Sequence, residues 1–401
     1  MRDSSIERVE SQGGDVTIRV SESELQEVAE GVAEERWTST IDHSFEYGVA
    51  HFSNFFSDKE SEKDEIVTAY SPAIQHQLQY GNFTAISAMN MEYKEHETFY
   101  KNDGFDVFWG ESLFWKNKKS SFTVNNAYGE TQIKSDDETD KPVALRTNVF
   151  FSEWNHELTP KTSYSLSFHY DISAYKSEVD KTANTRNFEY AAGLKYNISP
   201  LMNIFPEYTF SQYRVPKVGD HVSIDSHAFS FQTVRRLSPK IYISVKPTFS
   251  FSEFNNESIN TVGYKFRTGI SGGLGYRYSP KTTLSFVFGT GTVSDGIRTP
   301  DDAEAMTAGF TIKHVPKNRI EMKIQNTFFS SKSGKLVAEP LSPDLFFKPK
   351  TFIYQGSVEA SWEIVKNVSV NAKYLYHKRF ADIESGERTN QRIIFDAYYK
   401  F

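Results

Sequence analysis

The chain has 401 residues, of which 38% are hydrophobic and 15% aromatic, including 33 Phe and 22 Tyr. Its 45 Lys and Arg against 52 Asp and Glu leave a formal charge of −7, which argues against nucleic-acid binding. The absence of Cys excludes disulfides and Cys nucleophiles, and no run approaches the ~20 apolar residues of a membrane helix.

The first 36 residues differ from the rest of the chain. They open without an apolar signal segment, which indicates either a cytoplasmic protein or a mature chain whose signal peptide has been removed. Asp15–Val20 alternates like a short strand, and residues 21–24 match a capping box followed by apolar residues at helical spacing. Residues 1–36 are therefore predicted to form a periplasmic or lumen appendage; the alternative is a partly disordered leader.

From Trp37 onward the apolar residues repeat every second position. Residues 241–251, 352–364 and 368–376 each have an aromatic-rich face and a polar face. These runs are much longer than the about 5–6 residues of a typical strand in a globular protein. A long strand that is apolar on one face only is typical of a sheet that separates lipid from water.

Short turns and long loops alternate along this region. Between the turns lie long charged connections such as 131–141 and 294–304. Short periplasmic turns and long outer loops are typical of outer-membrane barrels. The turns that contain proline recur about every 40 residues, at Pro160, Pro200, Pro239, Pro280 and Pro316.

These patterns predict an all-β fold: one transmembrane, antiparallel, up-and-down β-barrel over residues 37–401, in the bacterial outer membrane. We count about 18 strands, or 16 because residues 104–128 alternate poorly. A soluble β-propeller also repeats about every 40 residues, but its blades contain four short strands. Closure is required because hydrocarbon offers no hydrogen-bond partners to a free sheet edge. Membrane lipid and lipopolysaccharide are then the expected surroundings.

The last strand ends the chain on an aromatic residue. Ile393, Phe395, Ala397, Tyr399 and Phe401 occupy alternate positions of this strand. This pattern resembles the C-terminal signal that the barrel assembly machinery reads in bacterial outer-membrane barrels. Tyr399 and Phe401 are the residues that carry it here, which implies that machinery as a partner.

Alternation also predicts which charged residues face the lumen. Their signs nearly balance, which favours a hydrated lumen with internal ion pairs and weak ion selectivity. The sharper alternatives are a transverse electric field or a polar track for sugar hydroxyls. The predicted lumen residues are Lys195, Glu207, Lys246, Lys265, Arg267, Glu321, Lys323, Glu359, Glu363, Lys373, Arg392 and Asp396.

The longest loop, residues 334–350, is unusually apolar for an exposed segment. An exposed apolar surface needs something to contact. We expect this loop to fold inward as a constriction or to bind a partner; the alternative is packing over neighbouring loops. The residues that carry this expectation are Leu336, Pro340, Leu345, Phe346 and Phe347.

Catalytic and cofactor motifs are weak. The glycines of residues 269–275 lie within an alternating strand rather than in a phosphate-binding loop, and the ten His are scattered. Ser167 and His169 share a predicted inner face, which leaves a lipid- or glycan-modifying enzyme of the outer leaflet as a minor alternative. An orienting third group and an oxyanion site are not visible in the sequence. We therefore expect no catalytic residue, metal or cofactor.

Four segments near the start of the predicted barrel resemble the opening of the β-barrel porin type 2 family. They are residues 45–48 (Phe-Glu-Tyr-Gly), 54–56 (Asn-Phe-Phe), 63–66 (Lys-Asp-Glu-Ile) and 71–72 (Ser-Pro). The resemblance extends in pattern over residues 37–401. It implies an outer-membrane pore or scaffold in exopolysaccharide secretion, for capsule or biofilm matrix, with polysaccharide and periplasmic export components as partners. The alternative function is a general diffusion porin for small solutes.

Overall fold

The structure, a computed structural model, describes residues 6–12, 15–20, 37–53, 64–98, 103–133, 143–175, 184–216, 221–256, 261–294, 302–317, 319–332, 337–339, 342–347, 350–381 and 388–400. Almost all of them lie in strands. The strands are β1 (Ile6–Gln12), β2 (Asp15–Val20), β3 (Thr38–Phe52), β4 (Glu65–Tyr80), β5 (Phe83–His96), β6 (Gly104–Lys116), β7 (Ser120–Ile133), β8 (Val143–Thr159), β9 (Thr162–Tyr175), β10 (Thr185–Ser199), β11 (Met202–Pro216), β12 (His221–Ser238), β13 (Ile241–Asn256), β14 (Thr261–Ser279), β15 (Thr282–Ser294), β16 (Asp302–Lys317), β17 (Ile320–Lys332), β18 (Val337–Glu339), β19 (Ser342–Phe347), β20 (Lys350–Val365), β21 (Val368–Ala381) and β22 (Arg388–Lys400).

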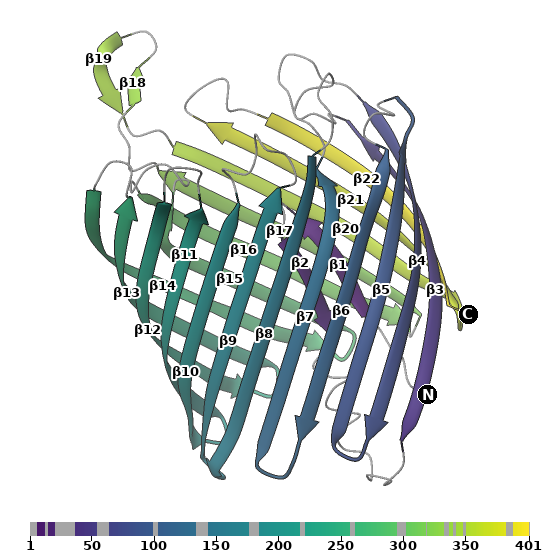
Figure 1. Cartoon of the computed structure of the whole chain (residues 1–401), viewed down its shortest axis with the longest axis horizontal. Coiled ribbons are helices and arrows are strands. Elements are labelled where there is room, and N and C mark those ends of the chain that lie inside the picture. Colours follow the sequence, from purple (N-terminus) through teal and green to yellow (C-terminus); the bar gives the residue numbers. More distant parts are fainter. Residues whose placement is uncertain are drawn as a thin grey trace.

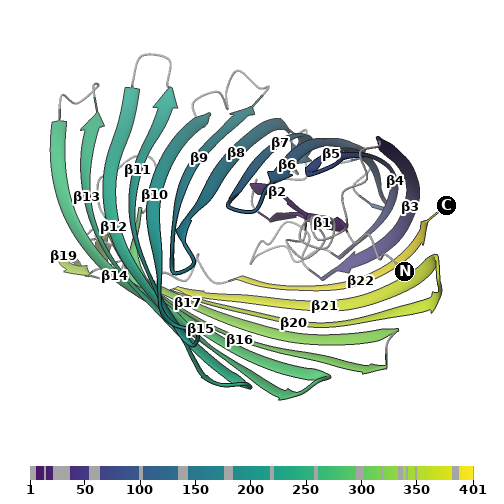
Figure 2. The same ribbon diagram turned by 90° about the horizontal axis from the view of Figure 1, so that it is seen from below.

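One closed barrel of 18 antiparallel strands contains β3–β17 and β20–β22 (Figures 1 and 2). Neighbours in the barrel are neighbours in sequence, except that β17 pairs with β20 and β22 closes the ring on β3. The predicted fold class is confirmed, with the larger of the two strand numbers. Within the described residues no helix is long and apolar enough to cross a membrane.

The poorly alternating region 104–128 forms two ordinary barrel strands, β6 and β7. The alternation is weak because a polar group interrupts the outer face of β6. Glu111 stands in register with Ser87 of β5 and Asn126 of β7, and the Trp109 indole N–H donates to the Ser87 hydroxyl at 3.4 Å. Polar residues thus interrupt the outer face across β5, β6 and β7. This interruption explains why the alternation of apolar residues is weak in the β6–β7 hairpin.

The short turns follow a common chemistry. At three Ser-Pro turns the Ser hydroxyl accepts a hydrogen bond from the backbone N–H two residues later, each at 3.2 Å: Ser199 from Leu201, Ser238 from Lys240, and Ser279 from Lys281. Proline presets the turn, and the hydroxyl satisfies an N–H that the strand ladder does not reach. The regular spacing seen in the sequence is thus the spacing of hairpins at one end of the barrel.

The outer face is apolar and exposed, and the buried apolar core is small. Among the described residues only Val67, Phe108, Ala127 and Leu145 are buried apolar side chains. Aromatic rings instead form continuous rows outside. One row crosses β3 to β6, with ring centroids 5.5, 6.5 and 4.8 Å apart: Tyr47, Tyr70, Tyr93 and Phe105. Such a row suits a lipid-facing belt.

Two small hairpins accompany the barrel. The hairpin β1–β2 lies inside the ring, where β2 contacts β7 and β8 (Figure 2). Its second strand matches the predicted strand Asp15–Val20; the helix predicted after it lies outside the described residues. The hairpin β18–β19 projects beyond the loop ends of the barrel strands (Figure 1).

Candidate functional site: the barrel lumen

Register and alternation define the inner face of the barrel. On β13, Ile243, Phe249 and Phe251 belong to the exposed outer set, so the intervening Lys246 lies on the opposite face. The same alternation, applied to each strand, assigns the predicted lumen residues to inner faces. The register supports this assignment, because an inner position of one strand pairs with an inner position of the next. Lys265 lies in β14 opposite Ser252. Whether these residues line a conducting path remains a prediction.

Charges of opposite sign occupy different sectors of the inner face. On β3–β10 the charged residues of the inner face are mainly acidic. We call the acidic residues the acidic wall: Asp42, Glu46, Glu65, Glu92, Asp106, Glu153, Glu157, Asp171 and Glu189. On β12–β16 the charged residues of the inner face are basic, and we call this set the basic wall: Arg236, Lys246, Arg267, Arg277 and Lys313. Separated charges of this kind create an electric field across a lumen.

Ion pairs cross-link the inner face. Lys246 Nζ lies 2.8 Å from Glu207 Oε1, and Lys313 Nζ lies 2.8 Å from Glu321 Oε2. Lys323, Glu359 and Lys373 stand in one register row across β17, β20 and β21. Because these groups are half-exposed to the lumen, each pair contributes little to stability, and their effect is on the local field.

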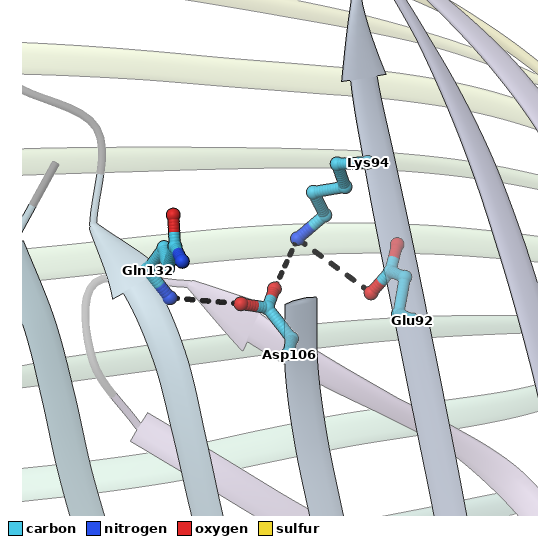
Figure 3. A network of polar contacts seen from close by, with 4 residues as sticks. All are labelled: Glu92, Lys94, Asp106 and Gln132. Atoms are coloured by element: carbon cyan, nitrogen blue, oxygen red, sulfur yellow. Dashed lines mark hydrogen bonds and ion pairs between the residues drawn. The ribbon is translucent and has the colours of Figure 1, made fainter. Parts of the chain in front are cut away.

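A cluster of polar side chains around the buried Asp106 lies on the inner face of β5–β7 (Figure 3). Lys94 Nζ donates to Asp106 Oδ2 at 2.5 Å and lies 3.6 Å from Glu92 Oε2. The Gln132 backbone N–H donates to Asp106 Oδ1 at 2.8 Å, and Asp106 is only 3% exposed. Our sequence analysis missed this cluster because Glu111 obscures the alternation of β6. Its burial and full hydrogen bonding indicate a structural role.

A second buried carboxylate supports that interpretation. Glu65, 1% exposed, accepts the backbone N–H of Thr98 at 3.1 Å, and Asp103 accepts that of His96 at 2.7 Å. Carboxylates that accept backbone N–H groups hold the ends of loops in place. The loop ends of β4–β7 are therefore fastened by buried charges, which keeps this part of the wall rigid.

The residues of the enzyme alternative are not arranged as a nucleophile and base. His169 Nε2 lies 3.2 Å from Asp171 Oδ2, and Asn187 donates to the same oxygen at 3.0 Å. Within the described chain, no hydrogen bond joins the Ser167 hydroxyl to His169, and no cluster of three His, Asp or Glu could hold a metal. A Ser nucleophile needs a base within hydrogen-bond reach.

Two predicted sites lie at the limits of what the structure describes. Leu345, Phe346 and Phe347 belong to β19, whereas Leu336 and Pro340 lie outside the described residues. Because the hairpin β18–β19 projects beyond the barrel, its position does not support a constriction; partner binding stays a prediction. Tyr399 lies on the outer face and is 43% exposed; Phe401 lies outside the described residues.

Neither a family model nor a curated protein matches the sequence. Solved structures do match it. OccAB3 from Acinetobacter baumannii aligns with a TM-score of 0.51 and 10% identity, over 90% of this chain and 99% of that chain. OccK2 from Pseudomonas aeruginosa in complex with glucuronate aligns with a TM-score of 0.54 and 8% identity, over 90% and 98%. The outer membrane protein OpdK from the same organism aligns with a TM-score of 0.50 and 7% identity, over 90% of this chain and 99% of that chain.

This chain has the fold of the bacterial outer-membrane porins. The likeness spans the barrel almost completely, which agrees with the predicted outer-membrane barrel. The finer resemblance to the β-barrel porin type 2 family receives no support, and nothing in the comparisons connects the chain with exopolysaccharide.

Proposed function

We propose that this protein is an outer-membrane channel through which small hydrophilic solutes diffuse. The observation that carries the proposal is the closed 18-strand barrel with an apolar outer face and a charged inner face. A barrel of this size is too wide for its own side chains to fill. Its polar inner face then encloses water, and its aromatic outer rows contact phospholipid and lipopolysaccharide.

The basic wall favours anionic solutes. Arg267 and Arg277 lie on β14, and in the described residues of β12–β16 no Asp or Glu occupies an inner position. The charge of Lys313 is offset by Glu321 on β17. A sector of one sign raises the local concentration of solutes of the opposite sign. The OccK2 structure is in complex with glucuronate, a small organic anion. We propose that sugar acids pass faster than neutral sugars.

Exopolysaccharide secretion is the less favoured function. A polymer needs a continuous wide passage, whereas the hairpin β1–β2 lies within the ring beside β7 and β8. We propose that residues 1–36 form an internal appendage that narrows the lumen. The last strand, with Tyr399 and Phe401, is proposed to carry the signal for the assembly machinery.

Liposome swelling tests the function directly. Purified protein in liposomes should admit glucose, and glucuronate at equal concentration should enter faster. Liposomes without protein provide the control for leakage. Absence of swelling with every small solute would contradict the proposal, and loss of surface polysaccharide in cells lacking the protein would favour the secretion function instead.

A further inference from the structure

A cavity of about 1000 Å³ lies at the short-turn end of the barrel, where β10–β15 meet their turns. Its lining includes two arginines, two tyrosines and small polar groups. We call it the short-turn pocket and define it by Asn203, Arg236, Tyr242, Arg277 and Ser285. It lies apart from the buried cluster on β5–β7.

Arg236 is held in place by its own turn. Its Nε donates to the Ser238 carbonyl and its Nη2 to the Pro239 carbonyl, each at 3.3 Å. A guanidinium has five donors, so these two bonds orient the group and leave other donors for a ligand. The side chain is therefore positioned in advance, which lowers the entropic cost of binding an anion.

Tyr242 lies between the two arginines in the register. It pairs with Arg236 on one side and with Gly275 on the other, and Arg277 follows Gly275 on the same face. A Cβ at position 275 would overlap ring atoms Cε1 and Cζ of Tyr242, so only glycine lets the ring lie against the strand. The Tyr242 side chain stays 52% exposed, which leaves it free to stack on a ligand ring.

The charge of the pocket is one-sided. Lys161, Arg236, Lys240 and Arg277 are in its lining, and the lining contains no Asp or Glu. In the part of the chain that the structure describes, the Arg277 guanidinium has no ion pair or side-chain hydrogen bond. Several cations without a counter-charge suit a doubly charged anion better than a single carboxylate. A phosphate monoester carries close to two charges at neutral pH and matches the guanidinium geometry.

We infer that the short-turn pocket binds small sugar phosphates. The phosphate lies between Arg236 and Arg277, and the sugar ring stacks on Tyr242. The inference rests on the proposed function, because it concerns a solute that has crossed the channel from the loop end. It adds a solute class and a location that neither the fold nor the comparisons supply.

Equilibrium binding to the full-length protein in detergent micelles, measured by calorimetry, tests this inference without requiring conduction. Glucose 6-phosphate should bind, inorganic phosphate should bind more weakly, and glucose should not bind measurably. Arg277→Gln should weaken glucose 6-phosphate by about tenfold, as expected for loss of a charge-assisted hydrogen bond. Arg236→Gln gives a second test of the same contact.

Two further variants separate the pocket from a general charge effect. Arg235→Gln removes a positive charge at the same end of β12 but on the outer face, in register with the exposed Ile243 and outside the pocket lining, and should leave binding unchanged. Gly275→Ala displaces the Tyr242 ring, so it should weaken glucose 6-phosphate but not inorganic phosphate. Equal losses in Arg277→Gln and Arg235→Gln, or equal binding of glucose and its phosphate, would overturn the inference. Liposome swelling without glucose 6-phosphate binding would contradict the pocket inference alone. Binding without liposome swelling would contradict the proposed channel function alone.

Discussion

Lys246 of β13 reaches across β12 to Glu207 of β11, with Nζ 2.8 Å from Oε1. Ser230, on the strand between them, donates to the same carboxylate oxygen at 3.3 Å. The pair therefore ties three strands together on the lumen side. It also neutralises one positive charge of the basic wall, so it limits how strongly that wall attracts anions.

Glu207→Gln should raise the preference of the channel for anions. The substitution keeps a hydrogen-bond acceptor for Ser230 but leaves the charge of Lys246 uncompensated. The reversal potential of a planar bilayer under a KCl gradient should shift toward chloride. Lys246→Gln is the matched control and should shift the potential toward potassium. Shifts of the same sign in both variants would contradict a lumen location for the pair.

Asp106→Asn should destabilise the barrel. Asp106 is 3% exposed and accepts from Lys94 and from the Gln132 backbone N–H, so a neutral amide weakens both bonds. Hydrogen bonds to charged groups contribute about 1.5–3 kcal/mol, and a loss of about 2 kcal/mol is expected. Urea unfolding in micelles measures the change. An unaltered midpoint together with altered conductance would indicate a functional rather than a structural role.

Phe249→Lys should destabilise the membrane-inserted barrel, whereas Ser250→Lys should not. Phe249 is 49% exposed on the outer face of β13, and Ser250 is the next residue and faces inward. A lysine at the bilayer midplane costs about 2–4 kcal/mol on the lipid face of a barrel. Unfolding from lipid vesicles compares the two variants. Equal stability of both would argue against lipid contact at the outer face.

Deletion of residues 1–36 should raise single-channel conductance. The hairpin β1–β2 lies within the ring against β7 and β8, and the inner-face residues Leu145 and Thr147 of β8 are only 3% and 4% exposed. Removing the hairpin uncovers that wall and widens the passage. The barrel strands do not depend on the hairpin for pairing, so the shortened chain should still assemble. Conductance equal to that of the full chain would place the hairpin outside the conducting path.

Strand periodicity and turn spacing determined the barrel from sequence alone. Side-chain alternation and Ser-Pro turns are local properties, so residues 241–251 or the turn at Pro239 reveal a strand and a hairpin without their neighbours. The weakest region was β6–β7, where Glu111 and Asn126 occupy outer positions that the count expected to be apolar. There the sequence left 16 strands as an alternative to 18, and the structure shows 18.

Only the tertiary structure decided which inner residues meet. Lys246 and Glu207 are 39 residues apart in sequence, and the register of three strands brings them within hydrogen-bond distance. The same holds for Arg236, Tyr242 and Arg277, whose pocket forms where successive turns converge. The alternation of apolar and polar residues along a strand predicts which face a residue occupies. The register between strands and the curvature of the closed sheet determine which side chains it contacts. The position of β1–β2 inside the ring likewise depends on contacts with β7 and β8 that no local pattern encodes.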